Sequence, residues 1–287
     1  MSGVPAAPKD TTKPAGMLGD LGPRLASGVV MIALALSTLI AGGLIFVLFW
    51  LAAALAINWE WQRMTGGPHA LLRSIGGGVV VVAVGALAAL GQIDAAVLVL
   101  VLGALAMGGL VRGPSRIWNA GGVLYAGVLV LAVTVLRHSI LSGFESILWL
   151  FAIVWGTDIM AYFGGRLIGG PKLWPRVSPS KTWSGFLVGI TSGALLGLAV
   201  LSFYAVELYP APIIGLGLLG GAIAQGGDLF ESALKRRFGF KDSSHLIPGH
   251  GGAMDRLDGF IAAAAFAAVF GAARAGVAAA AHGLFVW

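Results

Sequence analysis

The sequence predicts an all-α polytopic membrane protein. Of its 287 residues, 58% are hydrophobic and only 10% are charged, whereas an average soluble domain has about 25% charged residues. The mean hydropathy is +0.92, and a soluble fold could not bury so much apolar surface. A soluble enzyme, a disordered chain and a fibrous protein are therefore excluded. The absence of cysteine also excludes disulfides, thiolate nucleophiles and Cys-bound metals.

The polar residues 1–24 are expected to form a disordered cytoplasmic tail. They do not resemble a removable signal peptide, because the apolar run that follows is too long. That run, from Leu25 to Ile57, has no charged residue or histidine. As one helix it would measure roughly 50 Å, against a hydrocarbon core of about 30 Å. We therefore divide it at Ala41-Gly42-Gly43 into two spans.

The rest of the chain is expected to form one transmembrane catalytic domain with the first two spans, over 25–287. Further spans are expected at 74–93, 95–111, 117–136, Ser146–Thr157 with a continuation past Asp158, 182–206, 208–227 and 259–273. The total is about nine transmembrane helices.

The basic residues orient these spans. With the N-terminus in the cytoplasm and the C-terminus outside, every Lys and Arg except Arg137 and Arg274 lies on the cytoplasmic side. The positive-inside rule predicts this enrichment of Lys and Arg on the cytoplasmic side. The same bias explains the net charge of +6, so the charge does not indicate a nucleic-acid partner.

Half of the charged residues lie in two short cytoplasmic segments, near 158–184 and 228–258. In the second segment, Asp228 closes an apolar span, and Asp255 and Asp258 open the last helix with i, i+3 spacing. The positive-inside rule does not call for acids there. Because Mg²⁺ is typically bound by one or two carboxylates together with substrate phosphates, the three acids favour a metal site.

Cations and glycines accompany these acids. Lys235-Arg236-Arg237 and Lys241 lie nearby, and His250-Gly251-Gly252 precedes the last helix. The N–H groups of a glycine-rich turn can bind an anion, and phosphoryl transfer needs mainly positioning and charge neutralisation. The alternative for the cations alone is a solvated topological anchor, and a lone histidine is more often structural.

The first segment places Asp158 inside an otherwise apolar span. A carboxylate at mid-bilayer costs about 3 kcal/mol, and less near the cytoplasmic end. Asp158 either has a structural role in helix packing or capping, or its carboxylate faces a polar cavity. The short turn Ser178-Pro179-Ser180-Lys181-Thr182 does not match a P-loop, but its hydroxyls and lysine can hold phosphate oxygens.

Two charged residues have no assigned role. Glu60 lies in what looks like an interfacial aromatic anchor, Asn58-Trp59-Glu60-Trp61, and is expected to pair with a nearby arginine. Arg274 lies within the last span. It is expected to pack against a carboxylate or to extend to the interface.

The second segment closely resembles the signature of the phosphatidate cytidylyltransferases, also called CDP-diacylglycerol synthases. The signature is carried by Ser232-Ala-Leu-Lys235-Arg236, Lys241-Asp242, His245-Leu-Ile-Pro248-Gly-His250-Gly251-Gly252 and Asp255-Arg256-Leu-Asp258. Similarity extends to Gly227-Asp228-Leu-Phe-Glu231-Ser232, Trp155-Gly-Thr-Asp158, Ala161-Tyr162, Ser178–Trp183 and Trp59-Glu60-Trp61. Ala253 and Ser184 depart from the pattern, but neither removes a candidate ligand.

The resemblance implies that the protein transfers CMP from CTP to phosphatidate in phospholipid biosynthesis, with Mg²⁺ required and room for a monovalent ion such as K⁺. It implies direct attack of the lipid phosphate on the α-phosphorus of CTP. Asp228 and Asp255 would be the main metal ligands, with Asp258 third. The other implied catalytic residues are Lys235, Arg236, Lys241, His250 and Arg256. The implied substrate-binding residues are Asp158, Ser178, Ser180, Lys181, Thr182, Ser232, Gly251 and Gly252.

The expected location is a bacterial cytoplasmic membrane, with the active site at the cytosolic face where CTP meets phosphatidate. Homodimerisation is a further expectation of the resemblance. One alternative is a related cytidylyltransferase or kinase acting on another lipid, such as an archaeal ether lipid or a polyprenol. Another is an ion-coupled transporter with Asp158 and Arg274 on its path. The concentration of polar residues at one face favours the enzyme.

Overall fold

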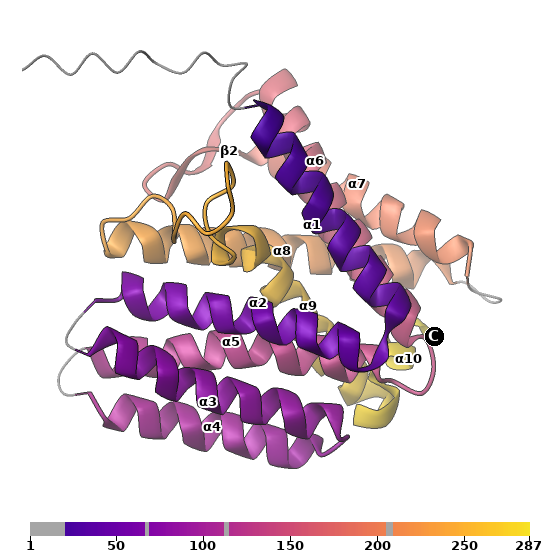
Figure 1. The fold of residues 1–287 in the computed structure, drawn as a ribbon. Coiled ribbons are helices and arrows are strands. Elements are labelled where there is room, and N and C mark those ends of the chain that lie inside the picture. Colours follow the sequence, from indigo (N-terminus) through magenta and orange to yellow (C-terminus); the bar gives the residue numbers. More distant parts are fainter. Residues whose placement is uncertain (1–20, 67–68, 112–114, 205–208) are drawn as a thin grey trace, which may run out of the picture.

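The computed structural model describes residues 21–66, 69–111, 115–204 and 209–287, and most of them are helical (Figure 1). The helices are α1 (Leu21–Ala41), α2 (Gly43–Met64), α3 (Ala70–Ala89), α4 (Ile93–Gly109), α5 (Ser115–Arg137), α6 (Gly143–Leu167), α7 (Trp183–Ser202), α8 (Pro210–Arg237), α9 (Met254–Ala275), η1 (Val277–Ala279) and α10 (Ala280–Phe285). Residues 1–20 of the predicted tail lie outside the described ranges, and α1 begins at Leu21.

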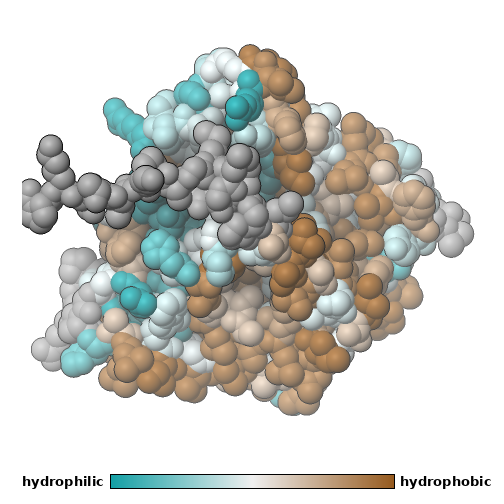
Figure 2. Space-filling view, turned by 45° about the horizontal axis from the view of Figure 1, so that its top comes forward, coloured by the Kyte–Doolittle hydropathy of each residue, from teal (hydrophilic) through white to brown (hydrophobic). Residues whose placement is uncertain are grey.

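The predicted class of polytopic all-α membrane protein is confirmed. Within the described residues, seven helices are long and apolar enough to cross a membrane, namely α2, α3 and α5 to α9. Shorter apolar helices cover Ala26–Ala41 and Ile93–Gly109. In Figure 2, hydrophobic residues cover most of the lower and right parts of the visible face, while hydrophilic residues gather at the upper left. This uneven surface is typical of a protein that faces lipid along its sides and water at one end.

The predicted division of the first apolar run is confirmed at its glycines. The helix α1 ends at Ala41 and α2 begins at Gly43, and Gly42 has a φ of +62°. A Cβ atom on Gly42 would lie 2.5 Å from Arg137 Nη2, which donates a hydrogen bond to Leu39 O at 3.1 Å. Both the left-handed backbone and the close guanidinium therefore require glycine at the turn.

Contacts at the helix ends place the end of α2 beside the start of α5, and the end of α1 beside the end of α5. At one end, Trp61 Nε1 of α2 donates to Trp118 O of α5 at 2.7 Å. At the other end, the backbone N–H of Ala281 donates to Ser139 Oγ at 3.2 Å, close to the Arg137–Leu39 contact. The turns between α1 and α2 and between α5 and α6 thus lie on the same side as the C-terminal helix (Figure 1).

The helices α6 and α7 pack closely along a row of glycines. Gly185, Gly189, Gly193 and Gly197 recur every four residues and share one face of α7. A Cβ atom on Gly193 would lie 2.6 Å from Ile153 O, and one on Gly189 would lie 2.7 Å from Thr157 O. Such small residues let two helix backbones approach directly. The row therefore fixes the position of the C-terminal half of α6 relative to the segment that enters α7.

A β-hairpin connects α6 and α7, formed by β1 (Lys172–Trp174) and β2 (Ser178–Thr182). The strands are antiparallel, with Lys172 opposite Thr182 and Trp174 opposite Ser178. The predicted turn at 178–182 is therefore wrong, because these residues form the strand β2. Pro179 is tolerated because a two-stranded hairpin has only edge strands. Thr182 then caps α7, since its Oγ1 accepts a hydrogen bond from the Gly185 N–H at 3.1 Å.

We predict that Gly193→Ala destabilises the protein, because the added methyl group would overpack the α6–α7 contact by about 1–3 kcal/mol. The expected result is a lower midpoint of thermal unfolding in detergent than for the parent protein. The matched control is Gly215→Ala in α8, where a Cβ atom would meet nothing within 4 Å. Equal midpoints for the two variants would contradict the close packing.

Candidate active site

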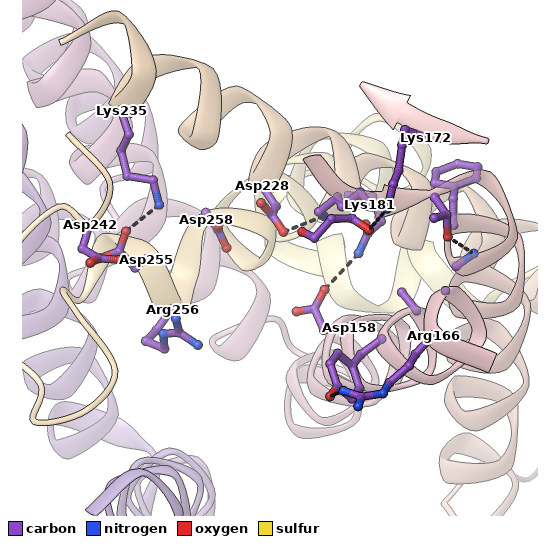
Figure 3. A pocket seen from close by; sticks show the side chains of 18 residues that line it. Asp158, Arg166, Lys172, Lys181, Asp228, Lys235, Asp242, Asp255, Arg256 and Asp258 are labelled. Atoms are coloured by element: carbon purple, nitrogen blue, oxygen red, sulfur yellow. Dashed lines mark hydrogen bonds and ion pairs between the residues drawn. The ribbon is translucent and has the colours of Figure 1, made fainter. Parts of the chain in front are cut away.

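A polar cavity of about 670 Å³ lies between the C-terminal half of α6, the hairpin, and the adjoining parts of α8 and α9 (Figure 3). Its charged lining residues are Asp158, Arg166, Lys172, Lys181, Asp228, Lys235, Asp242, Asp255, Arg256 and Asp258. The volume is typical of a small-molecule site. The fold therefore gathers a large share of the few charged residues of the chain around one space.

Lys181 of β2 connects three elements of the cavity. Its Nζ lies 2.5 Å from Asp228 Oδ2 of α8 and donates a hydrogen bond to Gln225 Oε1 at 2.6 Å. Gln225 Nε2 in turn donates to Asp158 Oδ1 of α6 at 3.0 Å. A partly buried ammonium group needs such partners, because its desolvation is otherwise costly. The chain of contacts holds the hairpin, α8 and α6 together around the cavity.

Lys235 of α8 forms a second charged cluster with α9. Its Nζ lies 2.6 Å from both Glu231 Oε2 and Asp255 Oδ1. Asp255 Oδ2 accepts three further hydrogen bonds, at 2.9 Å from Ser243 N, at 2.9 Å from Ser243 Oγ and at 2.8 Å from Gly252 N. Both oxygens of Asp255 are thus engaged by protein donors, and they tie the loop before α9 to α8.

Glu60 is the buried anchor of that loop. Its carboxylate is fully buried and accepts hydrogen bonds from Ser244 Oγ at 2.5 Å, from Ala253 N at 2.9 Å and from Met254 N at 2.7 Å. Ser243 Oγ adds a contact at 3.2 Å. The expected arginine partner is therefore wrong. The carboxylate instead satisfies the free N–H groups at the start of α9, where the helix dipole also favours a negative charge.

The glycine turn packs onto these acids. Gly251 has a φ of +80°, and a Cβ atom on it would lie 2.7 Å from Asp255 Oδ2. A Cβ atom on Gly252 would overlap the Glu60 carboxylate and Ser243 Oγ. The Gly252 N–H donates to Asp255. The turn therefore needs glycine in order to approach the two carboxylates closely, and anion binding by its backbone stays a prediction.

Most of the predicted site residues line the cavity, and several do not. The lining includes Asp158, Ser180, Lys181, Thr182, Asp228, Lys235, Asp255, Arg256 and Asp258. The residues outside it are Ser178, Ser232, Arg236, Lys241, His250, Gly251 and Gly252. Ser232 Oγ supports Asp228 Oδ1 at 3.3 Å, and His250 Nδ1 lies 2.6 Å from Ser27 Oγ of α1.

Five polar residues of the lining were not predicted from the sequence as site residues, namely Tyr162, Arg166, Lys172, Gln225 and Asp242. Gln225 carried a usable signal, because it is a polar residue in an apolar span and precedes Asp228 by three positions, which places both on one helix face. Arg166 and Lys172 were assigned only to the positive-inside rule. Local patterns give no indication that these cations meet the second segment in space.

Two carboxylates that line the cavity could hold a metal ion. Asp228 of α8 and Asp258 of α9 both point into the cavity (Figure 3). Within the described ranges, no three His, Asp or Glu side chains gather into a cage for a metal. A site with two carboxylates fits Mg²⁺, which keeps waters and binds substrate phosphates rather than occupying an all-protein cage.

Arg274 does not pair with a carboxylate among the described residues, so the first of the two alternatives for its role is wrong. Its Nη1 donates to Gly283 O at 2.9 Å and its Nη2 to Val286 O at 2.5 Å, and its guanidinium lies 3.8 Å from the centre of the Trp287 ring. The carbonyls at the end of α10 have no partner in the helix, and a cation satisfies them. This arginine therefore fixes the C-terminal helix.

Known proteins are similar to this chain over almost its whole length. A family described as the cytidylyltransferase family matches residues 23–273. The chain is 40% identical over 264 residues to a phosphatidate cytidylyltransferase of Brucella abortus (strain 2308), covering 89% of this chain and 94% of that protein. It is 44% identical over 119 residues to a phosphatidate cytidylyltransferase of Staphylococcus aureus (strain COL), covering 42% of this chain and 46% of that protein. The family resemblance found in the sequence is thereby confirmed.

We predict that Glu60→Gln loosens the loop at 238–253. In the parent protein both carboxylate oxygens of Glu60 accept hydrogen bonds, whereas in the variant the NH₂ group of the amide would face donors that it cannot bind. Loss of a buried, charge-assisted contact costs about 1–3 kcal/mol. The expected result is faster trypsin cleavage after Lys241 in the folded protein. The control is Glu145→Gln at the start of α6, whose carboxylate has no polar partner among the described residues. Unchanged cleavage of the Glu60 variant would contradict the anchoring role.

Proposed function

The chain belongs to the cytidylyltransferase family, and from this premise we propose that it transfers CMP from CTP to phosphatidate, giving CDP-diacylglycerol and pyrophosphate. The observation that carries the proposal is the single cavity in which cations from α6, the hairpin, α8 and α9 surround Asp228 and Asp258. Such a cavity can hold two phosphate-bearing substrates, because it offers both neutralising charge and carboxylates for a shared metal.

The reaction requires one bond to form and one to break at the α-phosphorus. A phosphate oxygen of phosphatidate attacks the α-phosphorus of CTP. The bond between this phosphorus and the oxygen that links it to the β-phosphorus breaks. Pyrophosphate leaves, and no covalent link to the protein is needed. The side chains contribute positioning and charge neutralisation. Lys181 and Lys235 lie beside carboxylates and can shift their contacts to arriving phosphates, and Arg256 adds a third positive charge.

We further propose that Mg²⁺ is held by Asp228 and Asp258 together with substrate phosphates. The ion would neutralise charge on the triphosphate when bound. Among the described residues, the Asp258 carboxylate accepts one hydrogen bond, from the adjacent Gly259 N–H at 2.7 Å, so it can take an additional ligand. Asp255 is instead committed to Lys235 and the loop, and we assign it the role of holding Lys235 in place.

We propose nine membrane crossings, with the N-terminus in the cytoplasm, the C-terminus outside and the cavity at the cytosolic face. The distribution of Lys and Arg supports this topology. It is also supported by the contacts that place the α1–α2 and α5–α6 turns at one end of the helices and the end of α2 at the other. The helix α4 is the shortest of the nine, at 17 residues. That length corresponds to roughly 26 Å, which is close to a hydrocarbon core of about 30 Å.

Two alternatives are less well supported. A kinase or a cytidylyltransferase for another lipid would use the same kind of cavity, but the relatives that cover most of the chain are named for phosphatidate. A transporter would need a polar path through the spans. Arg274 does not serve such a path, because its guanidinium is engaged by the C-terminal helix.

We predict that the purified protein releases pyrophosphate only when CTP, phosphatidate and Mg²⁺ are all present. Asp228→Asn and Asp258→Asn should each lower turnover by about a hundredfold or more, because a neutral amide is a poor ligand for Mg²⁺. The control is Asp94→Asn at the start of α4, away from the cavity. Near-normal turnover in either cavity variant would remove that residue from the metal site.

The topology can be tested by labelling, because the chain has no cysteine of its own. Gln92→Cys, in the turn between α3 and α4, is expected to react with an impermeant maleimide in intact cells. Arg116→Cys, at the start of α5, is expected to react only after permeabilisation. Labelling of both positions from the same side would show that α4 does not cross.

A further inference from the structure

Three cations of the cavity have no carboxylate partner. Among the described residues, Lys181 and Lys235 form ion pairs, whereas Arg166, Lys172 and Arg256 form none. Arg166 Nη1 donates to Tyr162 Oη at 2.9 Å, and Lys172 Nζ lies 3.5 Å from Ser180 O. Unpaired cations in a partly enclosed space create a positive potential that attracts anions.

These cations lie on two sides of the carboxylates. Figure 3 places Arg166 of α6 and Lys172 of β1 on one side, near Lys181 and Asp158. Arg256 of α9 lies on the opposite side, beyond Asp258. A reaction between two phosphate-bearing substrates needs such an arrangement, because the two like-charged groups must approach the same point from different directions.

The two sides differ in their surroundings. Next to Arg166, the end of α6 and the residue that follows it expose apolar side chains, with exposed fractions of 81% for Leu167 and 67% for Ile168, and Tyr162 is 58% exposed. In a membrane protein, exposed apolar side chains beside a cation mark the level at which a lipid headgroup meets its acyl chains. Arg256 adjoins the loop at 238–253, which contributes Asp242 to the cavity lining and exposes Lys241, together with Phe240 and Leu246.

We propose that Arg166 and Lys172 bind the phosphate of the lipid substrate, while Arg256 binds the triphosphate of the nucleotide. This assignment rests on the proposed function for the identity of the two substrates. Arg166 can form two parallel hydrogen bonds to one phosphate, and Lys172 supplies a second charge from the hairpin. Because α6 and β1 both contribute, the lipid phosphate is held between the helix and the hairpin.

The test is a separation of Michaelis constants. Arg166→Gln and Lys172→Gln are expected to raise the KM for phosphatidate at least tenfold, while the KM for CTP changes less than twofold. Arg256→Gln should do the reverse. Arg166→Lys should restore part of the loss, since it keeps the charge but not the two-pronged geometry. The matched control is Arg176→Gln, an exposed cation of the same hairpin that does not line the cavity.

A binding measurement distinguishes failure of this assignment from failure of the proposed function. Short-chain phosphatidate should bind the parent protein more tightly than short-chain phosphatidylcholine, and Arg166→Gln should remove that preference in a protein with unchanged thermal unfolding. If the Arg166 and Lys172 variants bind phosphatidate as the parent does, or raise only the KM for CTP, the assignment is overturned. If the parent binds phosphatidate but shows no turnover with CTP, the proposed function fails instead.

Discussion

The cavity depends on the contact between Lys181 and Asp228. The ammonium group lies 2.5 Å from the carboxylate of α8 and also reaches Gln225, which continues the chain of hydrogen bonds to Asp158 of α6. A partly buried charge is costly unless a partner within the fold compensates it, and Lys181 has two such partners. The pairing therefore does two things at once. It holds the hairpin against two helices. It also keeps a cation and two carboxylates at the wall of one cavity, where the lysine can change its contact from a carboxylate to an arriving phosphate.

A second buried charge holds the opposite wall. Glu60 lies near the end of α2, far from the loop in sequence, yet it receives the backbone N–H groups of Ala253 and Met254 as well as two serine hydroxyls. The start of α9 is thereby fixed, and with it the directions of Asp255, Arg256 and Asp258. The glycine turn before α9 exists in this form because no side chain fits between it and the two carboxylates. The helices α2 and α9 thus hold the polar loop in place through the buried carboxylates of Glu60 and Asp255, which accept its hydrogen bonds.

Much of this arrangement follows from local patterns. The length of the first apolar run and its paired glycines predicted the break between α1 and α2. The three acids that the sequence singled out, Asp228, Asp255 and Asp258, all line the cavity. The hairpin was missed because its strands are short and contain Pro179. The partners of Glu60 and the place of Arg166 and Lys172 could not be predicted, because they arise from contacts between distant segments. The positive-inside rule by itself explains why Arg166 and Lys172 lie on the cytoplasmic side, so nothing further in the sequence indicated that they belong to the cavity.

The central claim is that the cavity brings a lipid phosphate to the α-phosphorus of CTP. The most direct test follows a radioactive label placed at either the α- or the γ-phosphorus of CTP during turnover with phosphatidate. We predict that the α label enters the lipid product and that the γ label leaves in pyrophosphate. Transfer of the γ label to the lipid would identify a kinase and contradict the proposed transfer of CMP.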